Sequence, residues 1–201
     1  MDKTAARQRV YALRLWPKDL GVALVTIAAL MVALLLRQGV VGATRTFQSD
    51  AAPFTLSYPA TWHRVAPSAG ILLRLEDPRA ASTFKTTVTV ENRDLDPAAP
   101  PTVQALADRR IAQDGDLLAY RLLATEEATV AGARGLRLDY AYVVQPLDVP
   151  QLASPPVVVR ARQYIVVTSS GAYYLTLAAP ENAFAAAADR FAGMIEGVRM
   201  R

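Results

Sequence analysis

The side chains that could do acid–base or metal chemistry are few in this 201-residue chain. His63 is the only histidine, and the sequence contains no cysteine. A single imidazole excludes a histidine-rich metal site, and no Gly-x-Ser-x-Gly nucleophile elbow occurs to support a serine hydrolase. Disulfides, thiolate catalysis and cysteine-ligated zinc are excluded as well. We therefore expect no catalytic residue, and we place His63 in a strand or turn at the edge of the domain.

Two groups of carboxylates are the remaining candidates for metal chemistry. Glu91, Asp94 and Asp96 lie close together before a proline, and Asp114 and Asp116 flank a glycine. A calcium loop needs several convergent oxygens in the spacing Asp-x-Asp-x-Asp-Gly, which neither group has. Aspartate before glycine or proline is ordinary turn chemistry. We therefore predict no metal and no cofactor, and no carboxylate pair is singled out for glycoside hydrolysis.

Arg160 and Arg162 form the other charged pair of note. Residues two apart on a strand share one face, so both guanidinium groups lie on the same side of the predicted sheet. We expect Asp or Glu partners on neighbouring strands. The functional alternative is a docking site for an acidic partner.

The net charge of +4 suggests nucleic-acid binding until the charges are located. Residues 1–37 carry six Lys and Arg against two Asp, and the remaining residues carry equal numbers of each sign. A basic surface on the main domain is therefore not expected, and we predict no nucleic-acid partner. The 52% hydrophobic content excludes a disordered chain.

The N-terminal part is predicted to be a membrane anchor. Residues 20–36 form a run of 17 without a charge, which as a helix spans about 26 Å. Lys18 and Arg37 flank the run, and Trp16 precedes it at the level expected for an interfacial aromatic ring. We predict a transmembrane helix over 20–37 that contacts the lipid bilayer through residues 20–36.

The positions of the charges predict the orientation of this anchor. Five Lys and Arg in the tail 1–19 place the N-terminus in the cytoplasm, and a linker over 38–44 then leads to an exported domain over 45–201. The predicted location is the plasma membrane, crossed once. The alternative is a signal peptide cleaved after Ala43, although the apolar run is longer than usual for one.

Alternation between apolar and polar residues predicts antiparallel strands with one buried face. It occurs at 54–58, 84–91 and 136–144, and further strands are predicted at 119–130, 157–168 and 172–177. Glycine-containing turns at 131–135 and 169–171 predict two hairpins. The proline-rich stretch 145–156 is expected to be a long irregular loop.

Two segments have helical periodicity. Thr102 is placed to cap a helix that runs to about Gln113. A second helix follows Pro180, and its apolar stripe extends from Phe184 to Val198. We expect this stripe to pack on the apolar face of residues 136–144. The order of the elements predicts an α+β domain with an antiparallel β-sheet.

These residues carry a resemblance to a known family. The segment 54–62 (FTLSYPATW) resembles the opening strand of the PsbP-like and DcrB-like superfamily, and the segment 171–180 (GAYYLTLAAP) with its following helix is similar to the family's closing elements. The resemblance extends over about residues 45–200. It implies an antiparallel sheet sandwiched by helices and no catalytic machinery. The residues that carry it are taken as structural rather than catalytic: Tyr58, Pro59, Trp62, Tyr173, Tyr174, Phe184 and Phe191.

The resemblance also directs the functional prediction. Members of the superfamily are mostly extracytoplasmic accessory or assembly factors, among them an extrinsic subunit of photosystem II. We predict a non-catalytic accessory subunit of a membrane protein complex, with photosynthetic and respiratory electron-transport complexes as candidates. The alternative is a membrane-tethered binding module for a lipid or a small apolar ligand.

Overall fold

The computed structural model describes residues 17–50, 52–80, 82–96, 98–145, 155–169 and 171–200. Residues 1–16 of the predicted basic tail lie outside the described residues, as do residues 146–154 of the predicted proline-rich loop. The chain divides into two compact units, Met1–Gly42 and Ala43–Arg201.

The first unit contains one helix, α1 (Pro17–Val41). Proline is favoured at the first helical position, because its missing N–H needs no partner there. Side chains are described for residues 20–34, and the large apolar ones are all exposed: Leu20, Val22, Leu24, Val25, Ile27, Leu30, Met31, Val32 and Leu34. Among the described residues, no helix is both long and apolar enough to cross a membrane.

The helix α1 also corrects the predicted linker over 38–44. Residues 38–41 are helical, and only Gly42 and Ala43 separate α1 from the first strand. The helix continues to Val41 because no proline occurs between Arg37 and Gly42 to end it earlier.

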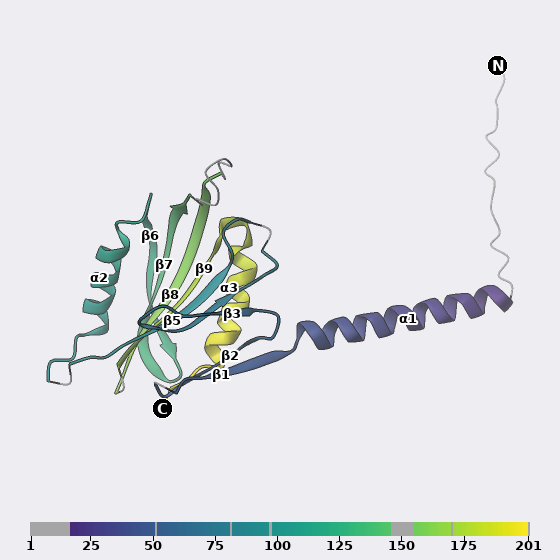
Figure 1. The fold of residues 1–201 in the computed structure, drawn as a ribbon, viewed down its shortest axis with the longest axis horizontal. Helices are drawn as coiled ribbons and strands as arrows, with labels where there is room; N and C mark the ends of the chain where they lie inside the picture. Colours follow the sequence, from purple (N-terminus) through teal and green to yellow (C-terminus); the bar gives the residue numbers. More distant parts are fainter. Residues whose placement is uncertain are drawn as a thin grey trace, which may run out of the picture. The chain divides into compact units, whose positions relative to one another are not determined.

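The second unit is an α+β domain (Figure 1). Its strands are β1 (Thr44–Gln48), β2 (Phe54–Pro59), β3 (His63–Val65), β4 (Ile71–Glu76), β5 (Thr87–Arg93), β6 (Arg121–Val130), β7 (Ala133–Val144), β8 (Val157–Thr168), β9 (Gly171–Pro180) and β10 (Arg199–Met200). Its helices are α2 (Val103–Asp114) and α3 (Glu181–Glu196). The strands form a sheet of order β1-β2-β10 and a larger sheet of order β3-β4-β5-β9-β8-β7-β6. All pairings are antiparallel, as predicted.

The predicted hairpins are present in the larger sheet. The pairing of β6 with β7 continues to Val130 and Ala133, so the turn consists of Ala131 and Gly132, whose φ angles are 50° and 81°. Positive φ at both central residues matches the right-handed twist of the two strands. Strand β8 has the predicted bounds 157–168, and it pairs with β9 up to Thr168 and Gly171.

Two hydrophobic cores lie on opposite faces of the larger sheet. The α3 core combines α3 with β2, β4, β5 and one face of β9, whereas the α2 core combines α2 with β7, β8 and the other face of β9. Figure 1 shows α2 and α3 on the two sides of the sheet. Every residue of β9 is buried, because both of its faces are covered.

One packing prediction was wrong. Leu138 and Tyr140 of the 136–144 face lie in the α2 core, whereas Phe184 and Phe191 of the 184–198 stripe lie in the α3 core. Period-two alternation shows that a strand has a buried face, but it does not show which of two helices covers that face.

Four strands were not predicted. Strands β3 and β10 have three and two residues, too few for a periodic signal. Strand β1 buries only Phe47, and β4 begins with three consecutive apolar residues that hide its alternation.

The seven residues that carry the family resemblance are placed as follows. Tyr58, Trp62, Tyr173, Phe184 and Phe191 are buried in the α3 core, Tyr174 is buried in the α2 core, and Pro59 ends β2. The rings of Phe54 and Tyr173 stack with centroids 5.6 Å apart, which joins the small sheet to the large one.

Candidate functional site

The residues first considered for chemistry lie in separate places. His63 begins the edge strand β3 and is exposed, as predicted. Glu91 is on β5, Asp94 and Asp96 follow that strand, and Asp114 ends α2. No group of three or more His, Cys, Asp or Glu side chains that could hold a metal ion occurs in the described part of the chain.

Two of these carboxylates meet at an arginine that the sequence analysis did not select. Arg110 on α2 contacts Glu91 with Nη2–Oε1 at 3.0 Å and Asp114 with Nε–Oδ2 at 3.2 Å. All three side chains are largely buried. The spacing of Arg110 and Asp114 at i, i+4 on a predicted helix could have indicated this ion pair from the sequence. The contact with Glu91 joins residues 19 apart and had no local signal.

Buried polar side chains of the sheet continue this cluster. Gln163 on β8 is fully buried. With its amide oxygen toward α2, it accepts from Arg110 Nη2 at 3.1 Å and from Thr176 Oγ1 at 2.6 Å. We assign this orientation because the opposite one would face the amide NH₂ group toward the donors of Arg110. The cluster therefore fixes the guanidinium of Arg110 between α2 and three strands.

For Arg110 and for Asp114 alike, burial and the neighbouring opposite charges shift the pKa in opposite directions. Burial lowers the pKa of Arg110, but Glu91 and Asp114 outweigh it and hold that pKa above its ordinary value. Burial raises the pKa of Asp114 despite the neighbouring Arg110. Burial, reinforced by the charge of Asp114, also raises the pKa of Tyr142 to about 12.

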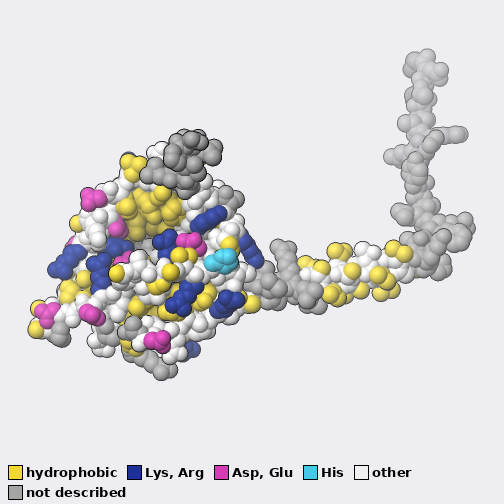
Figure 2. Space-filling model, viewed as in Figure 1, with side chains coloured by type: hydrophobic (Ala, Val, Ile, Leu, Met, Phe, Trp, Pro, Cys, Tyr) yellow, Lys and Arg dark blue, Asp and Glu magenta, His cyan; other side chains and the backbone are white. Residues whose placement is uncertain are grey.

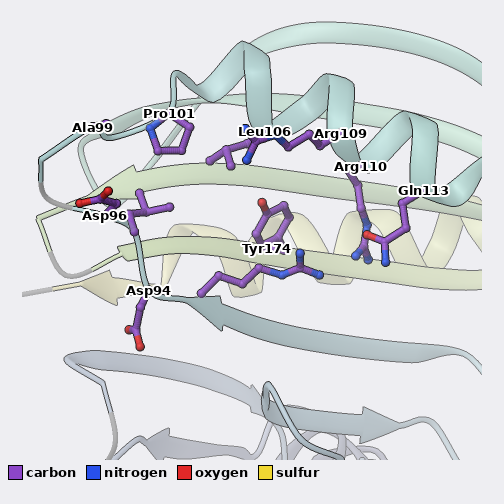
Figure 3. A pocket seen from close by; sticks show the side chains of 11 residues that line it. Asp94, Asp96, Ala99, Pro101, Leu106, Arg109, Arg110, Gln113 and Tyr174 are labelled. Carbon is purple, nitrogen blue, oxygen red and sulfur yellow. The ribbon is translucent and has the colours of Figure 1, made fainter.

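A cavity of about 270 Å³ opens beside this cluster (Figure 3). It is lined by Arg93, Asp94, Leu95, Asp96, Ala99, Pro101, Leu106, Arg109, Arg110, Gln113 and Tyr174. In Figure 3, Arg110 and Gln113 extend from α2 toward Tyr174 on β9, whereas the carboxylates of Asp94 and Asp96 point away from them. We call this space the α2 cavity.

The three arginines of the α2 cavity differ in how closely carboxylates pair with them. Arg110 is held by two carboxylates, whereas Arg93 is half exposed and lies 3.5 Å from Glu91. Arg109 is exposed and forms no ion pair with any residue that the structure describes. The guanidinium groups of Arg93 and Arg110 lie 5.3 Å and 5.6 Å from the centre of the Tyr174 ring.

A second candidate surface lies at the free edge of the large sheet. Strand β6 is last in the strand order, and exposed leucines occur on it and on the loop before it: Leu117, Leu118, Leu122 and Leu123. The backbone N–H of Val143 donates to the carbonyl of Leu118 at 2.8 Å, so the loop continues the edge of the sheet. Figure 2 shows apolar side chains gathered over this end of β6 and β7. We call the four leucines the β6 leucine surface.

The predicted partners of Arg160 and Arg162 are partly confirmed. Arg162 pairs with Asp139 on the neighbouring strand β7, with Nε–Oδ1 at 2.8 Å. Arg160 pairs with Glu181 at 3.4 Å, and this residue is on α3 rather than on a strand. Both guanidinium groups lie over the ring of Phe184, at 4.6 Å and 5.7 Å, so this face is partly covered.

Comparison with known proteins supports the fold assignment. No family model matches the sequence, and no curated protein matches it. The solution structure of cyanobacterial PsbP (CyanoP) from Synechocystis is similar, with a TM-score of 0.52 and 11% identity over 79% of this chain and 93% of that chain. The likeness shows that the α+β domain has a PsbP-like fold.

Two further solved structures show weaker likeness. PA94 from Pseudomonas aeruginosa has a TM-score of 0.49 and 12% identity, over 76% of this chain and 94% of that chain. LpqN from Mycobacterium tuberculosis has a TM-score of 0.48 and 13% identity, over 78% of this chain and 90% of that chain.

Proposed function

We propose that this chain is a membrane-anchored accessory subunit that presents its PsbP-like domain outside the cytoplasm to a membrane protein complex, without catalysing a reaction. The β6 leucine surface is the observation that carries this proposal. Photosynthetic and respiratory electron-transport complexes are the assemblies that the resemblance to PsbP favours.

The anchoring part of the proposal rests on the sequence around α1. The uncharged run 20–36 has basic residues on both sides, and the cytoplasmic orientation follows from the positive charges before it. The exposed apolar side chains of α1 surround the helix rather than forming one stripe, which is the pattern of a lipid-facing helix.

The docking part rests on the free edge of β6. An edge strand offers unpaired N–H and C=O groups, and apolar residues beside it add binding energy and selectivity. We propose that the occupant is an extended apolar segment from a membrane protein of the complex. A second copy of this chain that pairs about the middle of β6 is disfavoured, because that antiparallel register would bring Glu126 and Glu127 near the same carboxylates of the other copy.

A site-specific cross-linking experiment tests the docking surface. The tagged full chain carries a photoreactive amino acid at Leu123 or, as a control, at the exposed Ala186 of α3, and it is irradiated in native membranes. We expect Leu123 alone to cross-link to an integral membrane protein that also co-purifies in mild detergent. Equal cross-linking from Ala186 would contradict the proposed surface.

Substitution of the leucines completes this test. The variant Leu118→Ser with Leu123→Ser removes two exposed apolar side chains, and each is expected to cost about 1–2 kcal/mol of binding. We expect the complex to be lost in this variant and retained in Ala186→Ser. A fully assembled complex with the double variant would refute docking at β6.

The alternative function, binding of a lipid or small apolar ligand, needs an apolar cavity. The α2 cavity is lined by three arginines, two aspartates, Gln113 and Tyr174 in addition to four apolar residues. This lining favours a charged ligand over an apolar one.

A further inference from the structure

We propose that the α2 cavity binds a small carboxylic acid with a short apolar body, whose carboxylate pairs with Arg93 and Arg109. This inference is independent of the proposed docking function, because none of the four leucines of the β6 leucine surface lines the α2 cavity and the ligand needs no partner protein.

The first argument is the distribution of charge in the cavity. Arg110 is already neutralised by Glu91 and Asp114, so it is not free for a ligand. Arg109 has no ion pair among the described residues, and the contact of Arg93 with Glu91 is long at 3.5 Å. Two guanidinium groups with spare N–H donors at one cavity favour an anion.

The second argument is where the acidic side chains of the lining point. In Figure 3 the carboxylates of Asp94 and Asp96 are directed away from Tyr174 and Arg110. Asp96 is also engaged locally, because its Oδ1 accepts from the backbone N–H of Ala98 at 2.9 Å. The aspartates therefore border the cavity without occupying its cationic part.

The third argument is the size and apolar walls of the cavity. A volume of about 270 Å³ lies just below the usual range of ligand sites, so the ligand is small. Leu95, Pro101 and Leu106 supply apolar contact, and the ring of Tyr174 supplies a flat surface. An anion with a compact apolar or aromatic body fits this lining better than an inorganic ion.

Arg110 has a different part in this site. Its contacts with Glu91 on β5 and Gln163 on β8 hold α2 at a fixed position on the sheet, and Asp114 on the same helix orients its guanidinium. Arg109 lies on the same helix, so the cluster positions one of the two proposed ligand-binding guanidinium groups. Arg110 is a positioning residue and not a ligand-binding one.

Calorimetric titration of the full chain in non-ionic detergent tests the proposal, with benzoate as probe and benzamide as its uncharged counterpart. We expect saturable binding of benzoate and at least tenfold weaker binding of benzamide, because only the carboxylate forms charge-assisted hydrogen bonds. Inorganic phosphate is titrated separately and is expected to bind more weakly than benzoate.

Two variants make the test specific to the site. Arg109→Gln removes an exposed charge of the cavity, and Arg121→Gln removes an exposed charge on β6. We expect Arg109→Gln to weaken benzoate binding about tenfold, as the loss of one charge-assisted hydrogen bond predicts, and Arg121→Gln to leave it unchanged. Both variants are expected to fold normally, because neither arginine forms an ion pair with a described residue.

Several results would overturn the proposal. They are no saturable benzoate binding up to about 10 mM, equal binding of benzamide, or an equal loss in the two variants. Binding of phosphate without binding of benzoate would also overturn it, because the site would then select an inorganic anion.

Discussion

Trp62 and His63 are neighbours in sequence but are expected to respond very differently to substitution. Trp62 is 2% exposed in the α3 core, whereas His63 is exposed on the edge strand β3. A buried tryptophan removes about 200 Å² from water, which at about 25 cal/mol per Å² amounts to about 5 kcal/mol. We therefore expect Trp62→Ala to lower the free energy of unfolding by about 3–5 kcal/mol.

The neighbouring substitution is the control. His63→Gln keeps a polar side chain of similar reach at an exposed position, so it is expected to change the free energy of unfolding by less than about 0.5 kcal/mol. Urea unfolding of the full chain in detergent micelles, followed by circular dichroism, measures both variants without relying on tryptophan fluorescence. The Trp62 variant is expected to disappear from its complex because it unfolds, and the His63 variant to assemble normally.

Two results would refute this reasoning. A loss of less than about 1 kcal/mol in Trp62→Ala would show that the side chain is not packed as the structure has it. A folded and fully assembled His63→Gln protein that has lost an associated activity would contradict a non-catalytic function and indicate acid–base chemistry at His63.

Three further predictions concern topology, pH and a turn. Protease added to intact cells, or to spheroplasts if an outer membrane is present, is expected to cut the domain 44–201 and to spare residues 3–18; protection of the domain would contradict the orientation. The pKa of Asp114 is raised in the folded state, so protonation of its carboxyl stabilises the fold. This stabilisation is fully present below the pKa that Asp114 has in the unfolded chain, and it is lost as the pH rises through the pKa of the folded state. The free energy of unfolding of Asp114→Asn, measured between these two pKa values, is therefore expected to depend less on pH than that of the unsubstituted chain. The same pH dependence in both proteins would refute this. Ala131 has a φ of 50°, a conformation that asparagine adopts more readily than alanine. Ala131→Asn is therefore expected to raise the free energy of unfolding, measured by chemical denaturation, by about 1 kcal/mol. A lower free energy of unfolding in this variant would show that the turn is not strained.

The sequence predicted those parts of the fold that have a local signal. Strand β8 has its predicted bounds because the proline-rich stretch ends at Pro156 and a glycine-containing turn follows at 169–171. Thr102 caps α2 because its side chain accepts from the backbone N–H of Ala105. Strand β4 was missed because consecutive apolar residues have no period. The covering of β7 by α2 rather than α3 was missed because it depends on the topology of the whole sheet.

The candidate sites were less predictable, because they depend on contacts between distant residues. Glu91 and Asp114 were recognised as chemically capable, but their partner Arg110 was not, and its pairing with Glu91 joins α2 to β5. The exposure of the β6 leucines could not be read from the sequence either, since a leucine pair within a strand ordinarily indicates a core.

The position of Gln163 is an argument that the α2 cavity has a function. Gln163 is fully buried on the face of β8 that Val159, Ala161 and Ile165 otherwise make apolar. An apolar side chain there would avoid the desolvation of an amide, so a fold selected for stability alone has no need of glutamine at this position. Its hydrogen bonds to Arg110 and Thr176 instead fix the orientation of a charged helix beside the cavity. Sites where a sequence departs from the local rules of packing are where function is expected, and here the departure is a hydrogen-bond partner of Arg110, which lines the α2 cavity.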